Sequence, residues 1–230
     1  MNYLFHEFTN RDLWQAEAVK LISSCLKIDI RRYGHVSLLC SGGSTPGPVY
    51  QSLSESGVNW EKVTIGLVDE RWVDEDDPGS NAAGLRQSLL TSHARRATFI
   101  PMKNAALTAY DGQAQVQKDY QAIKKPYTIA VLGMGIDGHT ASWFPEAEGL
   151  DDILSPDNTN IVQAITAKPS AVTGDYLERM TLTYSALSQC DSLILLMTGR
   201  DKRAVLETAQ EQGLPISRLF GHGMTVLWAP

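Results

Sequence analysis

Strand-like runs and helix-like segments alternate along almost the whole chain. The strand-like runs are short, apolar and rich in β-branched residues, and they cover residues 35–40, 63–68, 98–100, 127–132, 161–165, 192–197 and 224–228. Segments with the apolar spacing of a helix lie between most of them, at residues 12–32, 46–56, 81–90, 111–124 and 202–212. Such alternation is typical of a largely parallel sheet that is covered on both faces. The sequence therefore predicts a doubly wound, mostly parallel, Rossmann-like α/β fold with helices on both faces.

The domain organisation follows from the length and from the lack of a linker. The chain has 230 residues, of which 43% are hydrophobic and 20% charged, as in an ordinary globular protein. It contains no internal repeat, no low-complexity tract and no stretch rich in Pro, Gly or Ser. We therefore expect a single domain over residues 1–230. The least regular stretch, residues 145–174, is either a loop that closes over a ligand or plain surface.

The net charge and the cysteines exclude several classes of protein. A net charge of −6 argues against a nucleic-acid surface, although a few local cations still allow an anionic metabolite to bind. Cys25, Cys40 and Cys190 are far apart, which favours reduced thiols over a disulfide framework. No stretch resembles a leader peptide or approaches the roughly 18 apolar residues of a membrane helix. We expect a cytoplasmic protein without a membrane partner, and the scattered histidines predict no metal site.

A glycine-rich turn follows the first predicted strand. Residues 41–47 read Ser-Gly-Gly-Ser-Thr-Pro-Gly, and a helix-like segment follows them. Free backbone N–H groups, a Ser or Thr cap and the positive end of a helix make such a turn a candidate anion site, although an ordinary capped turn has the same sequence pattern. Pro48 after Gly47 disfavours a nucleoside triphosphate loop, and Pro46 replaces the last glycine of a serine-hydrolase elbow.

Charged residues end the second predicted strand. Residues 68–73 read Val-Asp-Glu-Arg-Trp-Val, and the carboxyl end of a parallel strand faces the ligand crevice of a doubly wound sheet. Arg71 is suited to hold an anion there, and Asp69 to orient it or to bind sugar hydroxyls. A solvated ion-pair cluster is the alternative interpretation. Arg86, in the helix that begins near Asn81, is either a further cation of the site or part of an exposed helix face.

A histidine lies in a second glycine-rich loop. Residues 133–140 read Gly-Met-Gly-Ile-Asp-Gly-His-Thr and follow an apolar run, so His139 is placed to face a ligand and to exchange a proton near neutral pH. The glycine spacing also matches a dinucleotide site. That interpretation is disfavoured because the acids about 20 positions on, Asp151 and Asp152, lie in a loop-like segment.

One more strand-like run leads into a glycine and two cations. Arg200 and Lys202 follow Gly199 at the start of a predicted helix. A lysine there opposes the helix dipole, which hints that it faces a negatively charged ligand.

Six segments in the same order and spacing resemble the 6-phosphogluconolactonase family, which is part of the glucosamine/galactosamine-6-phosphate isomerase superfamily. They are residues 41–46, 68–73, 80–86, 132–145, 179–183 and 198–202, and they extend over nearly the whole chain. The related glucosamine-6-phosphate deaminases resemble Asp-Glu-Tyr at the second strand and Gly-His-Ile-Ala-Phe-Asn-Glu-Pro at the histidine loop. This chain has Arg71 and then Thr-Ala-Ser-Trp-Phe-Pro after His139, as in the lactonases. The lead from Lys168 to Tyr176 departs from the family pattern.

The resemblance implies a glucosamine-6-phosphate deaminase-like fold and an activity. The activity is hydrolysis of 6-phospho-D-glucono-1,5-lactone to 6-phospho-D-gluconate, the second step of the oxidative pentose phosphate pathway, without metal or organic cofactor. His139 is then the base that activates water, Arg71 neutralises negative charge, and Asp69 orients Arg71 or the sugar. Further residues are assigned to the phosphate: Gly42, Gly43, Ser44, Thr45, Arg86 and Lys202. Either Asp137 or a backbone carbonyl sets the histidine tautomer, and the candidate substrate contacts are Asp137, Arg179 and Arg200.

Two alternatives remain at this point. An amino-sugar 6-phosphate deaminase or isomerase would use the same fold, and so would a non-catalytic sugar-phosphate sensor. The partner expected in each case is a small sugar phosphate, bound by a monomer or a small homo-oligomer.

Overall fold

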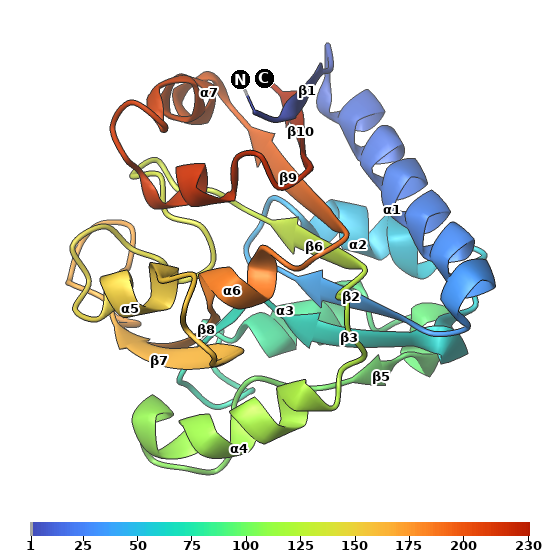
Figure 1. Cartoon of the computed structure of the whole chain (residues 1–230). Helices are drawn as coiled ribbons and strands as arrows, with labels where there is room; N and C mark the ends of the chain where they lie inside the picture. The colour runs from blue at the N-terminus through green and yellow to red at the C-terminus, as the bar shows by residue number, and fades with distance from the viewer. Residues whose placement is uncertain (1) are drawn as a thin grey trace.

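A seven-stranded, entirely parallel sheet forms the centre of the computed structural model, which describes residues 2–230 (Figure 1). The strands, in spatial order, are β1 (Leu4–Glu7), β10 (Met224–Ala229), β9 (Ser192–Thr198), β6 (Ile129–Leu132), β2 (Val36–Cys40), β3 (Val63–Leu67) and β5 (Thr98–Phe99). Every residue of β2, β3 and β6 is buried, as expected for strands covered on both faces. The predicted doubly wound α/β fold is confirmed.

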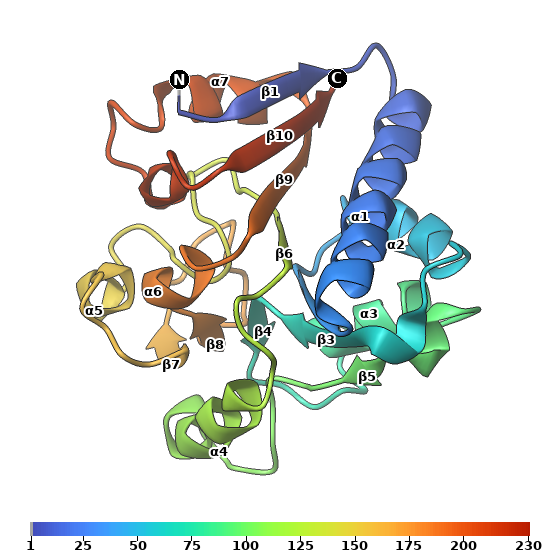
Figure 2. The same cartoon turned by 45° about the vertical axis from the view of Figure 1, so that its right-hand side comes forward.

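Helices cover both faces of this sheet. They are α1 (Arg11–Tyr33), α2 (Gly47–Ser54), α3 (Asn81–Ser88), α4 (Ala109–Gln121), α5 (Leu150–Leu154), α6 (Tyr184–Leu187) and α7 (Arg200–Thr208). In Figures 1 and 2, α1 and α2 lie on one side of the sheet, and α6 and α7 on the other. The five helices expected from the sequence are present, with shifted ends. The helix after the glycine turn begins at Gly47, and no side chain caps it, contrary to the expected Ser or Thr cap.

A second, smaller sheet was not expected from the sequence. It has three antiparallel strands in the order β4 (Asp69–Arg71), β8 (Glu178–Leu182) and β7 (Val162–Thr166). The strand-like run at 161–165 therefore lies outside the parallel sheet. Helix α4 covers β7, and the side chain of Gln117 accepts hydrogen bonds from the backbone N–H groups of Ile161 and Val162. These side-chain contacts satisfy the outer edge of β7.

The order of the parallel strands brings three distant segments together. Cys40 at the end of β2 is paired with Val131 of β6, and β6 is paired in turn with β9. The glycine turn, the histidine loop and the start of α7 therefore leave the same edge of the sheet side by side. This edge is where open parallel sheets bind ligands.

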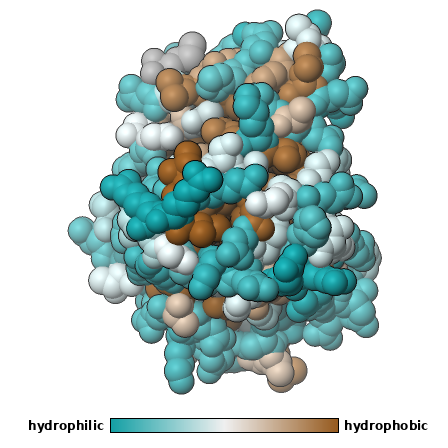
Figure 3. Space-filling view, turned by 90° about the vertical axis from the view of Figure 1, so that its right-hand side faces the viewer, coloured by the Kyte–Doolittle hydropathy of each residue, from teal (hydrophilic) through white to brown (hydrophobic). Residues whose placement is uncertain are grey.

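Figure 3 shows a mostly hydrophilic face with a small group of apolar side chains near its middle. No helix within residues 2–230 combines the length and the apolar character that a membrane span requires. Cys25, Cys40 and Cys190 are free thiols, and burial raises the pKa of Cys40 to about 12.

Candidate active site

A cavity of about 310 Å³ opens at the carboxyl ends of β2, β6 and β9, where the small sheet meets the large one. Nine residues singled out from the sequence line it, namely Gly42, Gly43, Ser44, Thr45, Asp69, Arg71, His139, Arg179 and Lys202. A larger cavity of about 810 Å³ lies on the other side of β4, where Asp74, Glu75, Asp76 and Asp77 line it. Those four carboxylates make the larger cavity unsuited to an anion. The smaller cavity, which is lined by the cations Arg71, Arg179 and Lys202, is therefore the candidate active site.

His139 forms a close pair with Asp137. The histidine Nδ1 lies 2.6 Å from Asp137 Oδ1, and the backbone N–H of His139 donates to the same oxygen at 3.2 Å. A carboxylate only accepts hydrogen bonds, so Nδ1 carries the ring proton and Nε2 is free to accept one. The ring also packs against Phe144, with 4.4 Å between the ring centres. The pair therefore presents one basic nitrogen in a fixed orientation.

The charge on Asp137 is maintained by this pair. Burial raises the pKa of Asp137, but the hydrogen bond from His139 and the attraction to its ring lower it, and the resulting pKa lies below the ordinary value. The carboxyl group is therefore ionised at neutral pH. An ionised Asp137 stabilises the imidazolium that forms when His139 accepts a proton.

Gly135 allows the loop to close around this pair. A methyl group in place of its hydrogen would overlap the ring of His139 and the carboxylate of Asp137. The backbone N–H of Gly135 donates to the His139 carbonyl oxygen at 3.0 Å, which holds the two ends of the loop together. The glycine spacing that resembled a dinucleotide site thus serves to expose His139.

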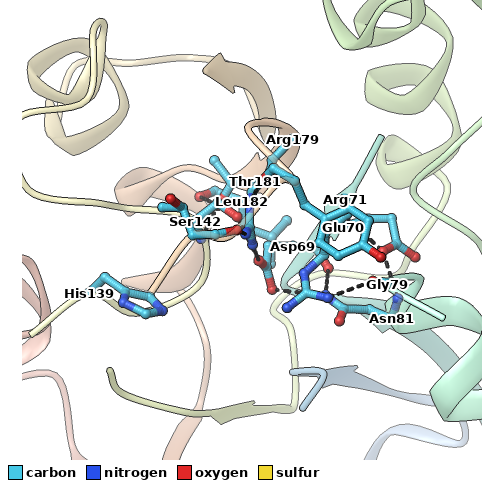
Figure 4. A network of polar contacts seen from close by, with 12 residues as sticks. Asp69, Glu70, Arg71, Gly79, Asn81, His139, Ser142, Arg179, Thr181 and Leu182 are labelled. Carbon is cyan, nitrogen blue, oxygen red and sulfur yellow. Dashed lines mark hydrogen bonds and ion pairs between the residues drawn. The ribbon is translucent and has the colours of Figure 1, made fainter. Parts of the chain in front are cut away.

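Asp69 connects the histidine loop to the small sheet (Figure 4). The hydroxyl of Ser142, which is fully buried three residues after His139, donates to Asp69 Oδ2 at 2.6 Å. Arg179 belongs to β8, the strand that pairs with β4, and its Nη1 lies 3.9 Å from the same carboxylate oxygen. The expected partner of Asp69 was Arg71, and the ion pair that the structure shows is instead with Arg179.

Arg179 is a buried cation in the wall of the cavity. Its Nε donates to the carbonyl oxygen of Tyr176 at 2.8 Å, and the guanidinium lies 4.8 Å from the ring centre of Phe144. Burial lowers the pKa of Arg179 to about 10, although the nearby Asp69 raises it. The side chain is therefore still charged at neutral pH, in surroundings that favour an anionic partner.

Arg71 extends from β4 toward the cavity. Its Nη1 donates to the carbonyl oxygen of Gly79 at 2.5 Å, and the guanidinium lies 5.8 Å from the ring centre of Tyr176. Its Nε is buried and has no hydrogen-bond partner within residues 2–230. Arg71 is thus held in place by one edge of its guanidinium, and the residue lines the cavity.

Two residues missed at the sequence level hold β4 against α3. Glu70 is buried and accepts hydrogen bonds from the backbone N–H groups of Arg71, Asn81 and Ala82, at 2.8, 2.7 and 2.8 Å. Asn81 donates from Nδ2 to the Asp69 carbonyl oxygen at 2.9 Å. A signal was present only for the start of α3, because a Ser-Asn pair before a helix is typical of capping, whereas Glu70 accepts from residues 11 and 12 positions away.

The glycine turn and Lys202 form the other wall. Gly42 lies so close to Asn81 that a methyl group would overlap the asparagine side chain, which explains why a glycine occurs there. Lys202 is half-buried, burial lowers its pKa, and within the described chain no carboxylate lies within ion-pair distance of it. An ammonium group in this position is available to an anionic ligand.

Arg86 and Arg200 do not join the site, contrary to expectation. Arg86 forms an exposed ion pair with Glu75, and its guanidinium lies 5.0 Å from the ring centre of Phe99. Arg200 is exposed at the first position of α7. Neither residue lines the cavity, so the assignment of the phosphate to Arg86 is not supported. Within residues 2–230 there is also no group of three or more side chains suited to bind a metal ion.

Comparison with known proteins agrees with this arrangement. The family model for glucosamine-6-phosphate isomerases/6-phosphogluconolactonase matches residues 9–228. The chain belongs to this family. A 6-phosphogluconolactonase of Xylella fastidiosa is 38% identical over 200 residues, which cover 85% of this chain and 80% of that protein. One of Rhizobium meliloti is 33% identical over the full length of both chains.

Solved structures of the family show the same fold. The crystal structure of a 6-phosphogluconolactonase from Shewanella baltica superimposes with a TM-score of 0.92 at 31% sequence identity, and covers 99% of this chain and 98% of that one. The resemblance that the six sequence segments indicated is thus confirmed at the level of the family and of the fold.

Proposed function

We propose that this member of the family hydrolyses 6-phospho-D-glucono-1,5-lactone to 6-phospho-D-gluconate. The observation that carries the proposal is the Asp137–His139 pair, joined at 2.6 Å, in a cavity that also holds Arg71, Arg179 and Lys202. The base suits hydrolysis of the uncharged ester group of a lactone. The three cations suit the negative charge of a sugar phosphate. The relatives described above are all named 6-phosphogluconolactonases, which supports the lactone over an amino sugar.

The chemistry needs one base and one site for negative charge. His139 Nε2 accepts a proton from a water molecule while the water oxygen attacks the lactone carbonyl carbon, and the carbonyl oxygen becomes negatively charged. The bond from that carbon to the ring oxygen then breaks, and the imidazolium returns its proton to the ring oxygen. The carboxylic acid so formed loses its proton to water. A base positioned in this way typically contributes about 10²- to 10⁴-fold to the rate.

The cations have two separate tasks in this proposal. Arg71 stabilises the oxyanion, since it is a cation that lines the cavity. The phosphate binds to Lys202, Arg179 and the backbone N–H groups of Gly42, Gly43, Ser44 and Thr45, at the start of α2. Asp69 then acts by positioning Arg179.

We further propose that residues 1–230 work as one domain, because the cavity takes walls from both sheets. We expect the protein to bind the sugar phosphate as a monomer or a small homo-oligomer. The free thiols fit the cytoplasm, and the net charge of −6 fits a protein without a nucleic-acid partner.

The proposal is tested by following freshly prepared 6-phosphogluconolactone, whose spontaneous hydrolysis provides the baseline. We expect purified protein to accelerate its disappearance, and the same preparation not to release ammonia from glucosamine 6-phosphate. No acceleration over the baseline would contradict the proposal.

A further inference from the structure

Tyr176 contacts both arginines of the candidate active site without lining the cavity itself. Its ring centre lies 5.8 Å from the guanidinium carbon of Arg71, and its backbone carbonyl oxygen accepts the hydrogen bond from Arg179 Nε at 2.8 Å. It ends the segment 168–176, in which the sequence departs from the family pattern. Because Tyr176 is not among the lining residues, it can affect a ligand only through its neighbours.

One carboxylate oxygen fixes both the ring of Tyr176 and the turn that contacts Arg71. The Tyr176 hydroxyl donates to Asp77 Oδ1 at 2.8 Å, and the backbone N–H of Gly79 donates to the same oxygen at 2.6 Å. The ring lies directly against Gly79, where a methyl group would overlap its atoms. The Gly79 carbonyl oxygen in turn accepts the hydrogen bond from Arg71 Nη1 (Figure 4). The ring and this carbonyl group are therefore held together, and they contact the guanidinium at two points.

Arg71 needs such contacts because its own strand offers little support. It is the last residue of β4, which has only three residues. An arginine side chain has several rotatable bonds, and ordering it costs conformational entropy. A cation stabilises a developing oxyanion best when it is oriented before the reaction begins. The contacts from Tyr176 and Gly79 supply this orientation.

We propose that Tyr176 is a positioning residue, whose ring keeps the guanidinium of Arg71 directed at the reacting group of the substrate. This inference rests on the proposed lactonase function, which assigns the oxyanion to Arg71. It adds to that function a residue that lies outside the cavity.

The first test compares two substitutions of Tyr176. Tyr176→Ala removes the ring but keeps the carbonyl group that binds Arg179, so we expect kcat for the lactone to fall about 10-fold and KM to change by less than about 2-fold. Tyr176→Phe keeps the ring against Gly79 and loses only the hydrogen bond to Asp77, so kcat should stay within about 3-fold of the wild type. A loss in Tyr176→Phe as large as in Tyr176→Ala would overturn the role of the ring.

Tyr184→Ala is the matched control. The Tyr184 ring centre lies 5.7 Å from the guanidinium carbon of Arg218, and its hydroxyl oxygen lies 3.0 Å from His222 Nε2, so the same kinds of contact are lost. Neither Tyr184 nor Arg218 lines the cavity, and kcat should therefore equal that of the wild type. Thermal unfolding gives the folded fraction to which kcat is referred. A fall of kcat as large as in Tyr176→Ala would trace the loss to the fold and overturn the proposal.

A double-mutant cycle shows whether Tyr176 acts through Arg71. Arg71→Ala alone should lower kcat about 10²-fold, as expected when one group that stabilises an oxyanion is removed. Adding Tyr176→Ala should lower kcat no further, because the group that the ring orients is already absent. A second loss of about 10-fold in the double variant would show that Tyr176 acts independently of Arg71.

A chemical measurement separates this inference from the lactonase function itself. Phenylglyoxal modifies arginine guanidinium groups, and peptide mapping by mass spectrometry gives the rate of modification at Arg71. Arg71 should react faster in Tyr176→Ala than in the wild type, and at the wild-type rate in Tyr184→Ala. An unchanged rate in Tyr176→Ala would overturn the role of the ring. A wild-type protein without lactonase activity would contradict the proposed function instead, and the reactivity of Arg71 would still decide whether Tyr176 holds it.

Discussion

The pair of His139 and Asp137 predicts that two substitutions lower kcat, one by removing the base and one by changing its tautomer. His139→Ala removes the base, so we expect kcat to fall about 10²- to 10⁴-fold while KM changes little. Asp137→Asn keeps the shape but lets the amide donate to Nδ1, which favours the wrong tautomer, so kcat should also fall. His93→Ala is the control, because His93 is exposed and does not line the cavity. Steady-state kinetics on the lactone provide the measurement, and wild-type kcat in His139→Ala would remove the histidine from the mechanism.

Lys202 and Arg86 provide a second contrast at this scale. Lys202→Ala removes a half-buried ammonium group from the cavity, so KM should rise about 10-fold or more with a smaller change in kcat. Arg86→Ala should change neither constant by more than about 2-fold, because its guanidinium pairs with Glu75 in solvent, where such pairs contribute little. A large rise of KM in Arg86→Ala alone would restore Arg86 to the phosphate site, as the family resemblance had implied.

The position of Arg86 outside the cavity could be predicted from its spacing to Asn81 in the helix. Asn81 faces the cavity, and at 3.6 residues per turn a residue five positions later points about 140° away from it.

His139 and Lys202 could be predicted because each follows a strand and a glycine. Ser142 could not, since its bond to Asp69 joins residues 73 positions apart. Such a contact depends on how two sheets pack.

Glu70 couples an element of the small sheet to a helix. Its carboxylate accepts from the backbone of Arg71 in β4 and of Asn81 and Ala82 in α3. Burial raises the pKa of Glu70 to about 7, although these backbone N–H groups lower it. Because the folded-state pKa lies above the unfolded value, folding favours the protonated form. The contribution to stability is therefore present below the unfolded pKa and is lost as the pH rises through 7.

This coupling predicts a pH dependence of stability that one substitution should remove. Between about pH 5 and pH 8 the wild-type free energy of unfolding should fall relative to that of Glu70→Gln, by up to about 3 kcal/mol. Urea unfolding of both proteins at four pH values provides the measurement, and the other titrating groups cancel in the difference. A difference that stays constant with pH would show that Glu70 does not titrate in this range.

The elements themselves were predicted unevenly, for a physical reason. The buried parallel strands are continuous apolar runs, and the long helices are periodic, so both stand out in the sequence. Strand β4 has three residues, all charged, and its pairing with β8 depends on contacts 110 positions away, such as Glu70 with Met180. Short polar strands of this kind carry no local signal. The small sheet that holds Asp69 and Arg179 was therefore missed, although its residues were singled out.

At the scale of the whole molecule, the cavity is assembled from segments that lie far apart in the sequence. Its lining comes from five parts of the chain, which include residues 41–46, the pair 69 and 71, residue 81, the loop that contains 133–135 and 139, and residues 172, 179, 196 and 202 near the small sheet and α7. A ligand that contacts all of these walls binds only the folded chain, since no unfolded chain keeps them together. Ligand binding must then raise the stability of the entire fold by mass action.

We therefore expect 6-phosphogluconate to raise the melting temperature as its concentration increases, with a gain of about 2.7 kcal/mol at 100 times its dissociation constant. Lys202→Ala should need a higher concentration for the same shift, and Arg86→Ala should follow the wild type. Thermal unfolding across a concentration series at fixed pH and salt provides the measurement. A shift that is the same in all three proteins would place the phosphate away from Lys202, since the affinity of a charged ligand depends on the cation that faces it.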